Sequence, residues 1–146
     1  MQLNKFTDYS LRILMYVAQP RDDLYTISEL AARLQVSENH TMKIVHFMSK
    51  QGWLITTRGN RGGIRLHLDT LNLKLGQIVR ILQGDNQVVE CNTPPCVLRQ
   101  NCGLKGILDQ ALEAFYHHLD QYAFSDVIQT SQNKHPANNT IPFLTL

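Results

Sequence analysis

The sequence predicts a mainly α-helical fold with one small β-hairpin, and three observations lead to this fold class. Apolar residues recur at three- and four-residue steps in several stretches of the 146-residue chain. N-capping residues precede these stretches. A glycine-rich run at 58–63 separates two short strand-like segments. The composition, 43% hydrophobic and 18% charged, suits one domain with an appendage.

Three helices are expected before residue 52. The first runs from about Thr7, its expected N-cap, to Ala18. The second begins at residues 26–29, which match the capping-box pattern. The third opens at Ser37 as N-cap and ends before Gly52, a glycine suited to the position after a helix end. Two short helices joined by a tight turn, of which the second is longer, are typical of a helix-turn-helix.

A projection at 100° per residue separates two faces of the third helix. The face expected to be buried consists of Thr41, Ile44, Val45 and Met48. The opposite face carries hydrogen-bond donors and positive charge without an acid, and consists of Asn39, Lys43, His46 and Lys50. Such a face suits a helix in the major groove of DNA, although a solvated face of any small helical domain also has this pattern.

A hairpin is expected directly after the third helix. Residues 53–57 and 64–68 form its strands, and Arg58 and Arg61 lie in the glycine-rich connection. The predicted fold is therefore a winged helix-turn-helix over residues 1–82, with a cationic wing tip able to contact the DNA backbone. Basic residues also predominate here: residues 1–67 hold nine Lys or Arg and five Asp or Glu, whereas the remainder holds five and seven. A basic surface of this kind favours a polyanionic partner.

In the second half of the chain, the sequence pattern predicts a helix at 73–82, a cysteine loop at 83–102 and a long helix from Gly103 to Tyr122. The long helix has a broad apolar stripe, which needs a partner surface. We therefore expect region 103–130 to pair two subunits, and residues 131–146 to form a polar, disordered tail. No apolar run suits a membrane span or a secretory signal, so the chain is expected to be cytoplasmic with no membrane partner.

All three cysteines of the chain lie in the loop, at Cys91, Cys96 and Cys102, in a C-x4-C-x5-C pattern. Thiolates are soft ligands that suit an iron–sulfur cluster or zinc. A zinc site with His117 or His118 as fourth ligand is one alternative, and a thiol switch, which would leave one thiol over, is another. Enzyme function is not expected, because no recognised catalytic motif or nucleotide-binding loop occurs.

Three features together resemble one known family. These are residues 6–9 with Leu11 and Arg12, the R-G-x-x-G-G wing, and the cysteine pattern before a long helix. Over about residues 1–130 the chain resembles the iron–sulfur winged-helix transcriptional repressors. It is most similar to the nitric-oxide-sensitive members, whose recognition helix resembles residues 36–40 and 43–44. The members that regulate cluster biogenesis have different cysteine spacing and a histidine where this chain has Lys105.

The resemblance implies a homodimer with one [2Fe–2S] or [4Fe–4S] cluster per subunit, held by the three cysteines. Asp8 matches a carboxylate that reaches across the dimer as fourth ligand in a relative, and Glu90 and Asp85 are lesser candidates. The implied function is a repressor that binds double-stranded operator DNA while the cluster is intact and releases it when nitric oxide reacts with the cluster. The expected DNA-binding residues are Ser37, Asn39, His40, Lys43, His46, Lys50, Arg58 and Arg61. The alternatives are a same-fold sensor of iron or cluster supply and a zinc-stabilised DNA-binding module.

Overall fold

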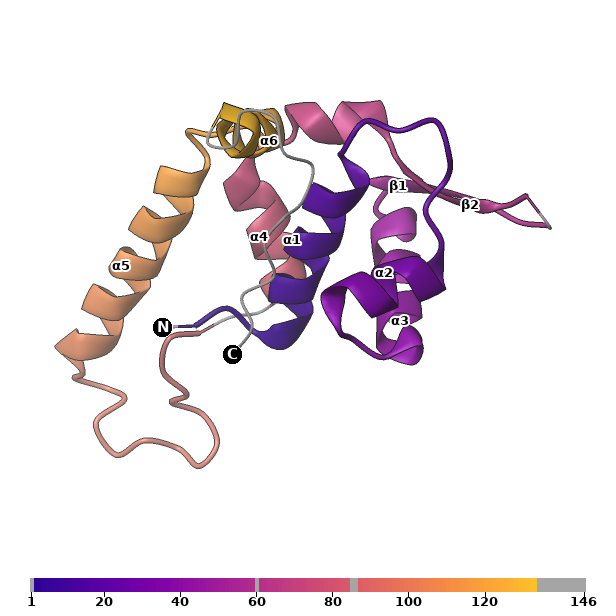
Figure 1. Cartoon of the computed structure of the whole chain (residues 1–146). Helices are drawn as coiled ribbons and strands as arrows, with labels where there is room; N and C mark the ends of the chain where they lie inside the picture. Colours follow the sequence, from indigo (N-terminus) through magenta and orange to yellow (C-terminus); the bar gives the residue numbers. More distant parts are fainter. Residues whose placement is uncertain (1, 60, 85–86, 134–146) are drawn as a thin grey trace.

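The computed structural model describes residues 2–59, 61–84 and 87–133 of the chain (Figure 1). Within these ranges the helices and strands follow in the order α1 (Lys5–Val17), α2 (Ile27–Leu34), α3 (Glu38–Lys50), β1 (Leu54–Thr57), β2 (Gly63–Leu66), the 3-10 helix η1 (Leu68–Asn72), α4 (Leu75–Gln83), α5 (Gly103–Leu119) and α6 (Phe124–Asn133). The two strands form an antiparallel hairpin in which Leu54 pairs with Leu66 and Thr57 with Gly63. The expected mainly helical fold with a β-wing is confirmed.

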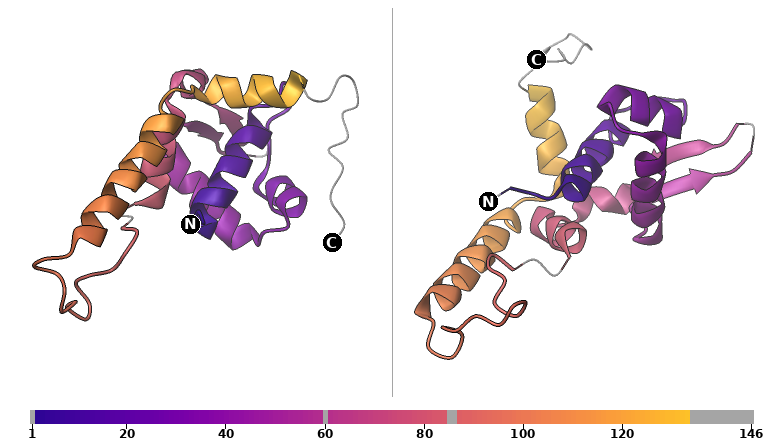
Figure 2. Two further views of the ribbon diagram at one scale, coloured as in Figure 1. Left: turned by 90° about the vertical axis from the view of Figure 1, so that its left-hand side faces the viewer. Right: turned by 90° about the horizontal axis from the view of Figure 1, so that it is seen from below.

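The winged domain has one hydrophobic core, to which every helix except α5 contributes. Its fully buried side chains include Leu14 of α1, Leu30 of α2, Ile44 of α3 and Ile78 of α4. The hairpin covers one side of this core with Ile64, which is 3% exposed. Figures 1 and 2 show the hairpin and α5 extending away from this core in different directions. The wing and the cysteine segment that precedes α5 are therefore separate projections of one domain.

The first helix begins two residues before the predicted start, and the assignment of Thr7 as its N-cap is wrong. The side chain of Asn4 caps α1 by accepting a hydrogen bond from the Thr7 backbone N–H at 2.7 Å. Thr7 itself is fully buried, and its hydroxyl donates to Gln83 Oε1 at 2.7 Å. The long-range partner at the end of α4 explains why a good capping residue occupies an interior position.

The long helix ends at Leu119, three residues before the predicted end, and a further helix that the sequence patterns do not indicate follows it. Helix α6 returns to the core through Phe124 and Ile128, which are one turn apart and buried. Its start is held by backbone bonds from Phe124 N to Leu73 O and from Leu75 N to Tyr122 O, both 2.9 Å. The helix reaches Asn133, so the expected tail boundary at residue 131 falls inside α6, and residues 134–146 lie outside the described ranges.

Helix α5 is attached to α4 by a close approach near its C-terminal end. A Cβ atom built on Gly76 would lie 2.6 Å from Tyr116 O and still nearer to the Asp120 carboxylate. Beside this point the Arg80 guanidinium lies 4.2 Å from the centroid of the Tyr116 ring and makes two 3.0 Å hydrogen bonds to the Glu113 carboxylate. The other end of α5 extends beyond the winged domain (Figure 2).

Replacing Gly76 by alanine is expected to lower the free energy of unfolding by about 1–3 kcal/mol, because the added methyl group forces α4 and α5 apart. Urea unfolding followed by circular dichroism measures the change. Gly106→Ala is the control, since a Cβ at Gly106 meets nothing within 4 Å. In the interior of a helix that substitution is expected to be neutral or stabilising. Equal free energies of unfolding for the two variants would contradict the importance of the close packing of α4 against α5 at Gly76.

Candidate nucleic-acid interface and cysteine centre

The orientation of α3 agrees with the two faces expected from the sequence. Its buried residues are Thr41, Ile44, Val45 and Met48. The side chains of Asn39, Lys43, His46 and Lys50 are exposed. Among the described residues, no carboxylate forms an ion pair with either lysine. The exposed face of α3 therefore offers free cations and hydrogen-bond donors to a polyanion.

Two other expected DNA-binding residues lie at the start of α3 and have contacts inside the chain. The hydroxyl of Ser37 accepts a hydrogen bond from the His40 backbone N–H at 3.3 Å, which confirms Ser37 as N-cap. The ring of His40 packs edge-on against Tyr9, with the centroids 5.6 Å apart. A second edge-on contact joins Phe6 and Phe47 at 5.3 Å. Helix α1 thus fixes the position of α3, and His40 has only part of its side chain free for another partner.

Arg58 and Arg61 lie in the turn between β1 and β2, at the tip of the wing, and both side chains are exposed. Gly59 has a φ of +108°, and Gly62 N donates to Gly59 O at 2.9 Å, so the turn depends on its glycines. A third arginine that the sequence patterns do not single out, Arg65, is exposed on β2. In the described part of the chain none of these three arginines pairs with an acid.

The base of the wing is anchored by Arg21, a residue that no sequence pattern indicates. Tyr25 pairs with Ile64 of β2 through two backbone hydrogen bonds of 3.0 and 2.7 Å. The Arg21 guanidinium lies 3.8 Å from the centroid of the Tyr25 ring and bonds both oxygens of Glu29 at 2.6 and 3.0 Å. This hydrogen-bonded pair lowers the pKa of Glu29 and raises that of Arg21. The loop before α2 and the wing are therefore joined as one unit.

Replacing Arg61 by alanine is expected to weaken binding to all DNA sequences alike, because a wing-tip cation contacts phosphates rather than base edges. The slope of log affinity against log salt concentration should flatten by about one unit for each phosphate that the protein no longer neutralises. Fluorescence anisotropy with specific and random duplexes over a salt series measures both effects. Lys74→Ala removes an exposed cation at the start of α4 and serves as control. A change confined to sequence preference would contradict the assignment.

The three cysteines lie on the segment that joins α4 to α5. All are free thiols; Cys91 is 8% exposed, and Cys96 and Cys102 are half-buried. The segment turns back on itself where Cys96 N donates to Cys91 O at 3.1 Å, and Cys102 is the residue immediately before α5. Among the described residues, no three His, Cys, Asp or Glu side chains are gathered closely enough to hold a metal ion. The thiols are therefore neighbours along one loop without forming a closed site.

The candidate fourth ligands have other partners or lie outside the described residues. The Asp8 carboxylate pairs with Arg12 at 2.8 and 3.0 Å. One oxygen of Glu90 accepts from the backbone N–H groups of Asn92 and Thr93 at 2.6 and 3.3 Å. Asp85 is not described. Lys105 has its ammonium 2.6 Å from Asp109, and this hydrogen bond raises the pKa of Lys105. The group therefore stays protonated at neutral pH and has no lone pair for a metal.

The structure disfavours the zinc site with His117 or His118. Cys102 precedes the first turn of α5, and both histidines are in its last turn. His117 lies fifteen positions after Cys102, which along an α-helix is a separation of about 22 Å, a distance that no single zinc ion bridges. The ring of His118 instead packs against Tyr122, with centroids 5.6 Å apart. A three-cysteine, one-histidine site cannot form within one chain at these positions.

Comparisons with known proteins agree on family and fold. The family described as "Rrf2: Iron-dependent Transcriptional regulator" matches residues 3–130. The chain is 37% identical over 137 residues to the HTH-type transcriptional regulator NsrR of Bacillus subtilis, covering 91% of this chain and 94% of that protein. It is 38% identical over 132 residues to NsrR of Shouchella clausii, with coverages of 88% and 89%. These names agree with the expectation of a regulator rather than an enzyme.

Solved structures show the same fold at lower identity. IscR of T. potens superposes with a TM-score of 0.71 at 19% identity, covering 94% of this chain and 93% of that one. The oxidised form of CymR of Staphylococcus aureus gives a TM-score of 0.67 at 18% identity, with coverages of 88% and 97%. Within the described residues, no helix combines the length and hydrophobicity needed to cross a membrane.

Proposed function

The chain belongs to the Rrf2 family of transcriptional regulators, and on that premise we propose that it is a nitric-oxide-responsive repressor. As a homodimer it binds operator DNA while each subunit holds an iron–sulfur cluster, and it releases the DNA when nitric oxide reacts with the cluster. The similarity to regulators named NsrR over about nine-tenths of the chain supports this function. The exposed cationic surface of α3 and the wing supports the DNA partner.

The three cysteines carry this proposal. Cys91, Cys96 and Cys102 would hold the cluster, and Asp8 is the proposed fourth ligand. The donor set fits the chemistry, because three free, soft thiolates on one short loop match an iron–sulfur cluster better than a hard cation. When bound, the cluster would supply the iron with which nitric oxide reacts. If Asp8 is a ligand, its carboxylate must leave Arg12.

The cysteine segment is well placed to transmit a change, because each of its ends joins a different functional part. Cys102 leads directly into α5, whose first turns carry exposed apolar residues. At the other end, Gln83 Oε1 accepts hydrogen bonds from Thr7 Oγ1 at 2.7 Å and from Asn4 N at 3.1 Å. Helix α1, which these bonds hold, contacts α3. Ordering or releasing the segment would therefore affect both α5, the proposed dimerisation helix, and the winged domain.

The DNA-binding step follows from the same geometry. Two winged domains must stand about 34 Å apart to contact half-sites separated by one turn of DNA. Asn39, Lys43 and His46 are proposed to contact base edges or phosphates from α3. Lys50 and the wing arginines are proposed to contact the backbone, which positions the protein without reading sequence.

Anaerobic purification followed by a DNA-binding titration tests this function. The expected product is brown, with stoichiometric iron and sulfide, and its affinity for operator DNA falls on the order of a hundredfold after anaerobic addition of nitric oxide. Protein freed of iron by a chelator is the control and should bind as weakly as the nitric-oxide-treated sample. Colourless protein containing zinc, or brown protein whose DNA affinity ignores nitric oxide, would contradict the proposal.

A second candidate function is a sensor of iron or cluster supply, which the family's description as iron-dependent favours. The titration distinguishes the two functions. A supply sensor changes its DNA affinity between iron-loaded and iron-free forms, but its iron-loaded form keeps that affinity when nitric oxide is added in an amount equal to the iron.

A further inference from the structure

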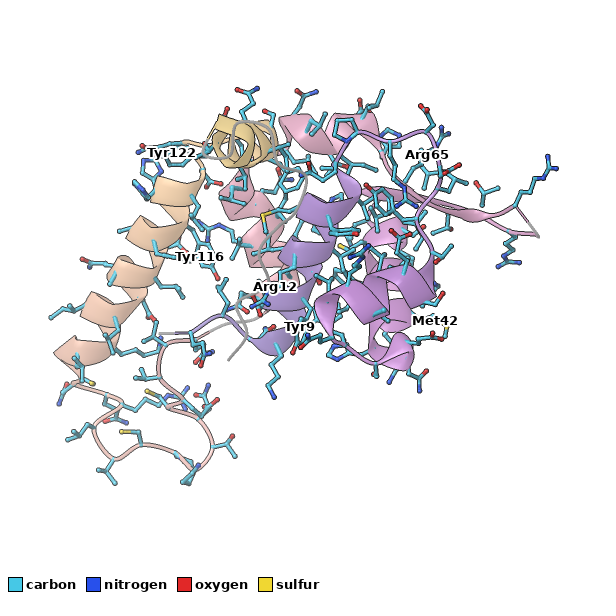
Figure 3. All side chains as sticks on the ribbon, in the orientation of Figure 1. Tyr9, Arg12, Met42, Arg65, Tyr116 and Tyr122 are labelled. Atoms are coloured by element: carbon cyan, nitrogen blue, oxygen red, sulfur yellow. The ribbon has the colours of Figure 1, made fainter. Side chains whose placement is uncertain are left out.

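One apolar side chain interrupts the polar surface of α3. Met42 is 53% exposed, and of the exposed large hydrophobic residues in the described part of the chain it is the only one on α3. The packing of α3 does not require it, because the buried face is complete and the partly exposed Phe47 packs against Phe6. In Figure 3 Met42 lies at the outer edge of the winged domain, on the far side of α3 from α1.

Met42 shares its surface with two of the proposed DNA-binding residues. It lies three positions after Asn39 and four positions before His46, and residues at these spacings are neighbours on a helix. All three side chains are exposed. If Asn39 and His46 approach the floor of a major groove, Met42 must enter it with them. Its thioether side chain is long, unbranched and adaptable, and no polar group on it can form a strong hydrogen bond.

The major groove offers one apolar partner for such a side chain. Each base pair presents donors and acceptors there, and thymine alone adds a methyl group. We propose that Met42 is a specificity-determining residue that recognises the 5-methyl group of a thymine in each operator half-site. This inference rests on the proposed DNA-binding role of α3 and adds to it a base preference that neither Lys43 nor a wing arginine can supply.

Substitution of deoxyuridine for thymine provides a direct test, since it removes only the methyl group. The probe is the tightest-binding duplex recovered from a random-sequence library by the anaerobically purified protein. Each thymine is replaced in turn by deoxyuridine, symmetrically in both half-sites, and affinity is measured by fluorescence anisotropy. The affinity of the wild-type protein is expected to fall about fourfold per methyl group removed at one thymine position. The Met42→Ala variant should bind the thymine duplex correspondingly more weakly. Its thymine-to-uracil ratio, meaning its affinity for the thymine duplex divided by its affinity for the duplex with uracil at that position, should fall to about one.

Three further variants make the result specific. Met42→Leu keeps an apolar side chain and should retain the thymine preference, whereas Met42→Gln should abolish it. Lys43→Ala should weaken binding while leaving the thymine-to-uracil ratio unchanged. Thermal unfolding of Met42→Ala should match that of the wild type, because the side chain is half-exposed.

Two results would overturn the role of Met42: no thymine dependence in the wild-type protein, or the same thymine-to-uracil ratio in wild type and Met42→Ala. Failure of the proposed function has a different signature. A protein that recovers no preferred sequence from the library does not read DNA through α3, and that result overturns the proposed interface together with this inference.

Discussion

Cys91→Ser, Cys96→Ser and Cys102→Ser are each expected to produce a colourless protein that no longer represses. Each Cys→Ser substitution replaces a soft thiolate by a hydroxyl that is protonated at neutral pH and is a poor iron ligand. Iron content should fall from one cluster per subunit to nearly none, and affinity for operator DNA should fall on the order of a hundredfold, to the value of iron-free protein. Iron and sulfide analysis, visible absorbance and anisotropy measure the three effects.

Two controls separate loss of the cluster from loss of the fold. Thr93→Ala changes an exposed residue of the same segment and should retain iron and DNA binding. The far-ultraviolet circular dichroism of the serine variants should match that of the wild type, because the core of the winged domain contains none of the cysteines. Full iron occupancy in any one of the three variants would remove that cysteine from the proposed ligand set.

The winged domain could be predicted from the sequence because its signals are local. Thr26 and Ser37 lie next to the backbone N–H groups that they cap, and their positions are correct to the residue. Gly52 adopts a φ of +75° after α3, as expected of a glycine that follows a helix end. The hairpin is indicated by two short strand patterns around glycines. In each case the residues that determine the element are within a few positions of one another.

Long-range contacts determine the elements that the sequence does not predict. Helix α6 has only Phe124 and Ile128 as buried apolar residues, and its start depends on bonds to Leu73 and Leu75, about fifty residues earlier. No periodic stripe distinguishes so short a helix from a loop. Thr7 resembles an N-cap for the same reason, because the partner that explains its position, Gln83, is 76 residues away.

The candidate site divides in a similar way. The cysteines and the exposed face of α3 could be recognised from spacing alone. The stretch from Cys91 to Cys102 has 12 residues and α3 has 13, so residues that are close in the sequence also lie close in space. The anchoring of the wing by Arg21 could not, since its partners are in α2 and in the loop leading to it, which pairs with β2.

The start of α5 has the properties of a subunit interface. Leu104 is 61% exposed and Ile107 is 65% exposed, and the neighbouring cysteine segment adds Val97 and Leu98 at 97% and 66%. An apolar surface of this kind on a projecting helix is unfavourable in water and typical of a protein–protein contact. Because the stripe lies on a helix, a second copy of the chain can cover it by isologous packing, in which the same residues meet across a two-fold axis.

The double substitution Leu104→Asp with Ile107→Asp is therefore expected to convert the proposed dimer to a monomer, since it places four unpaired carboxylates in the proposed interface. Operator affinity should fall more than about a hundredfold, because one winged domain then contacts a single half-site without the gain from linking two. Light scattering coupled to gel filtration measures the mass, and anisotropy measures the affinity.

Leu68→Asp is the matched control, since Leu68 is 75% exposed on η1, away from α5. A double variant that remains dimeric at micromolar concentration would show that another surface pairs the subunits. A monomer with undiminished operator affinity would instead show that DNA binding does not need the pair.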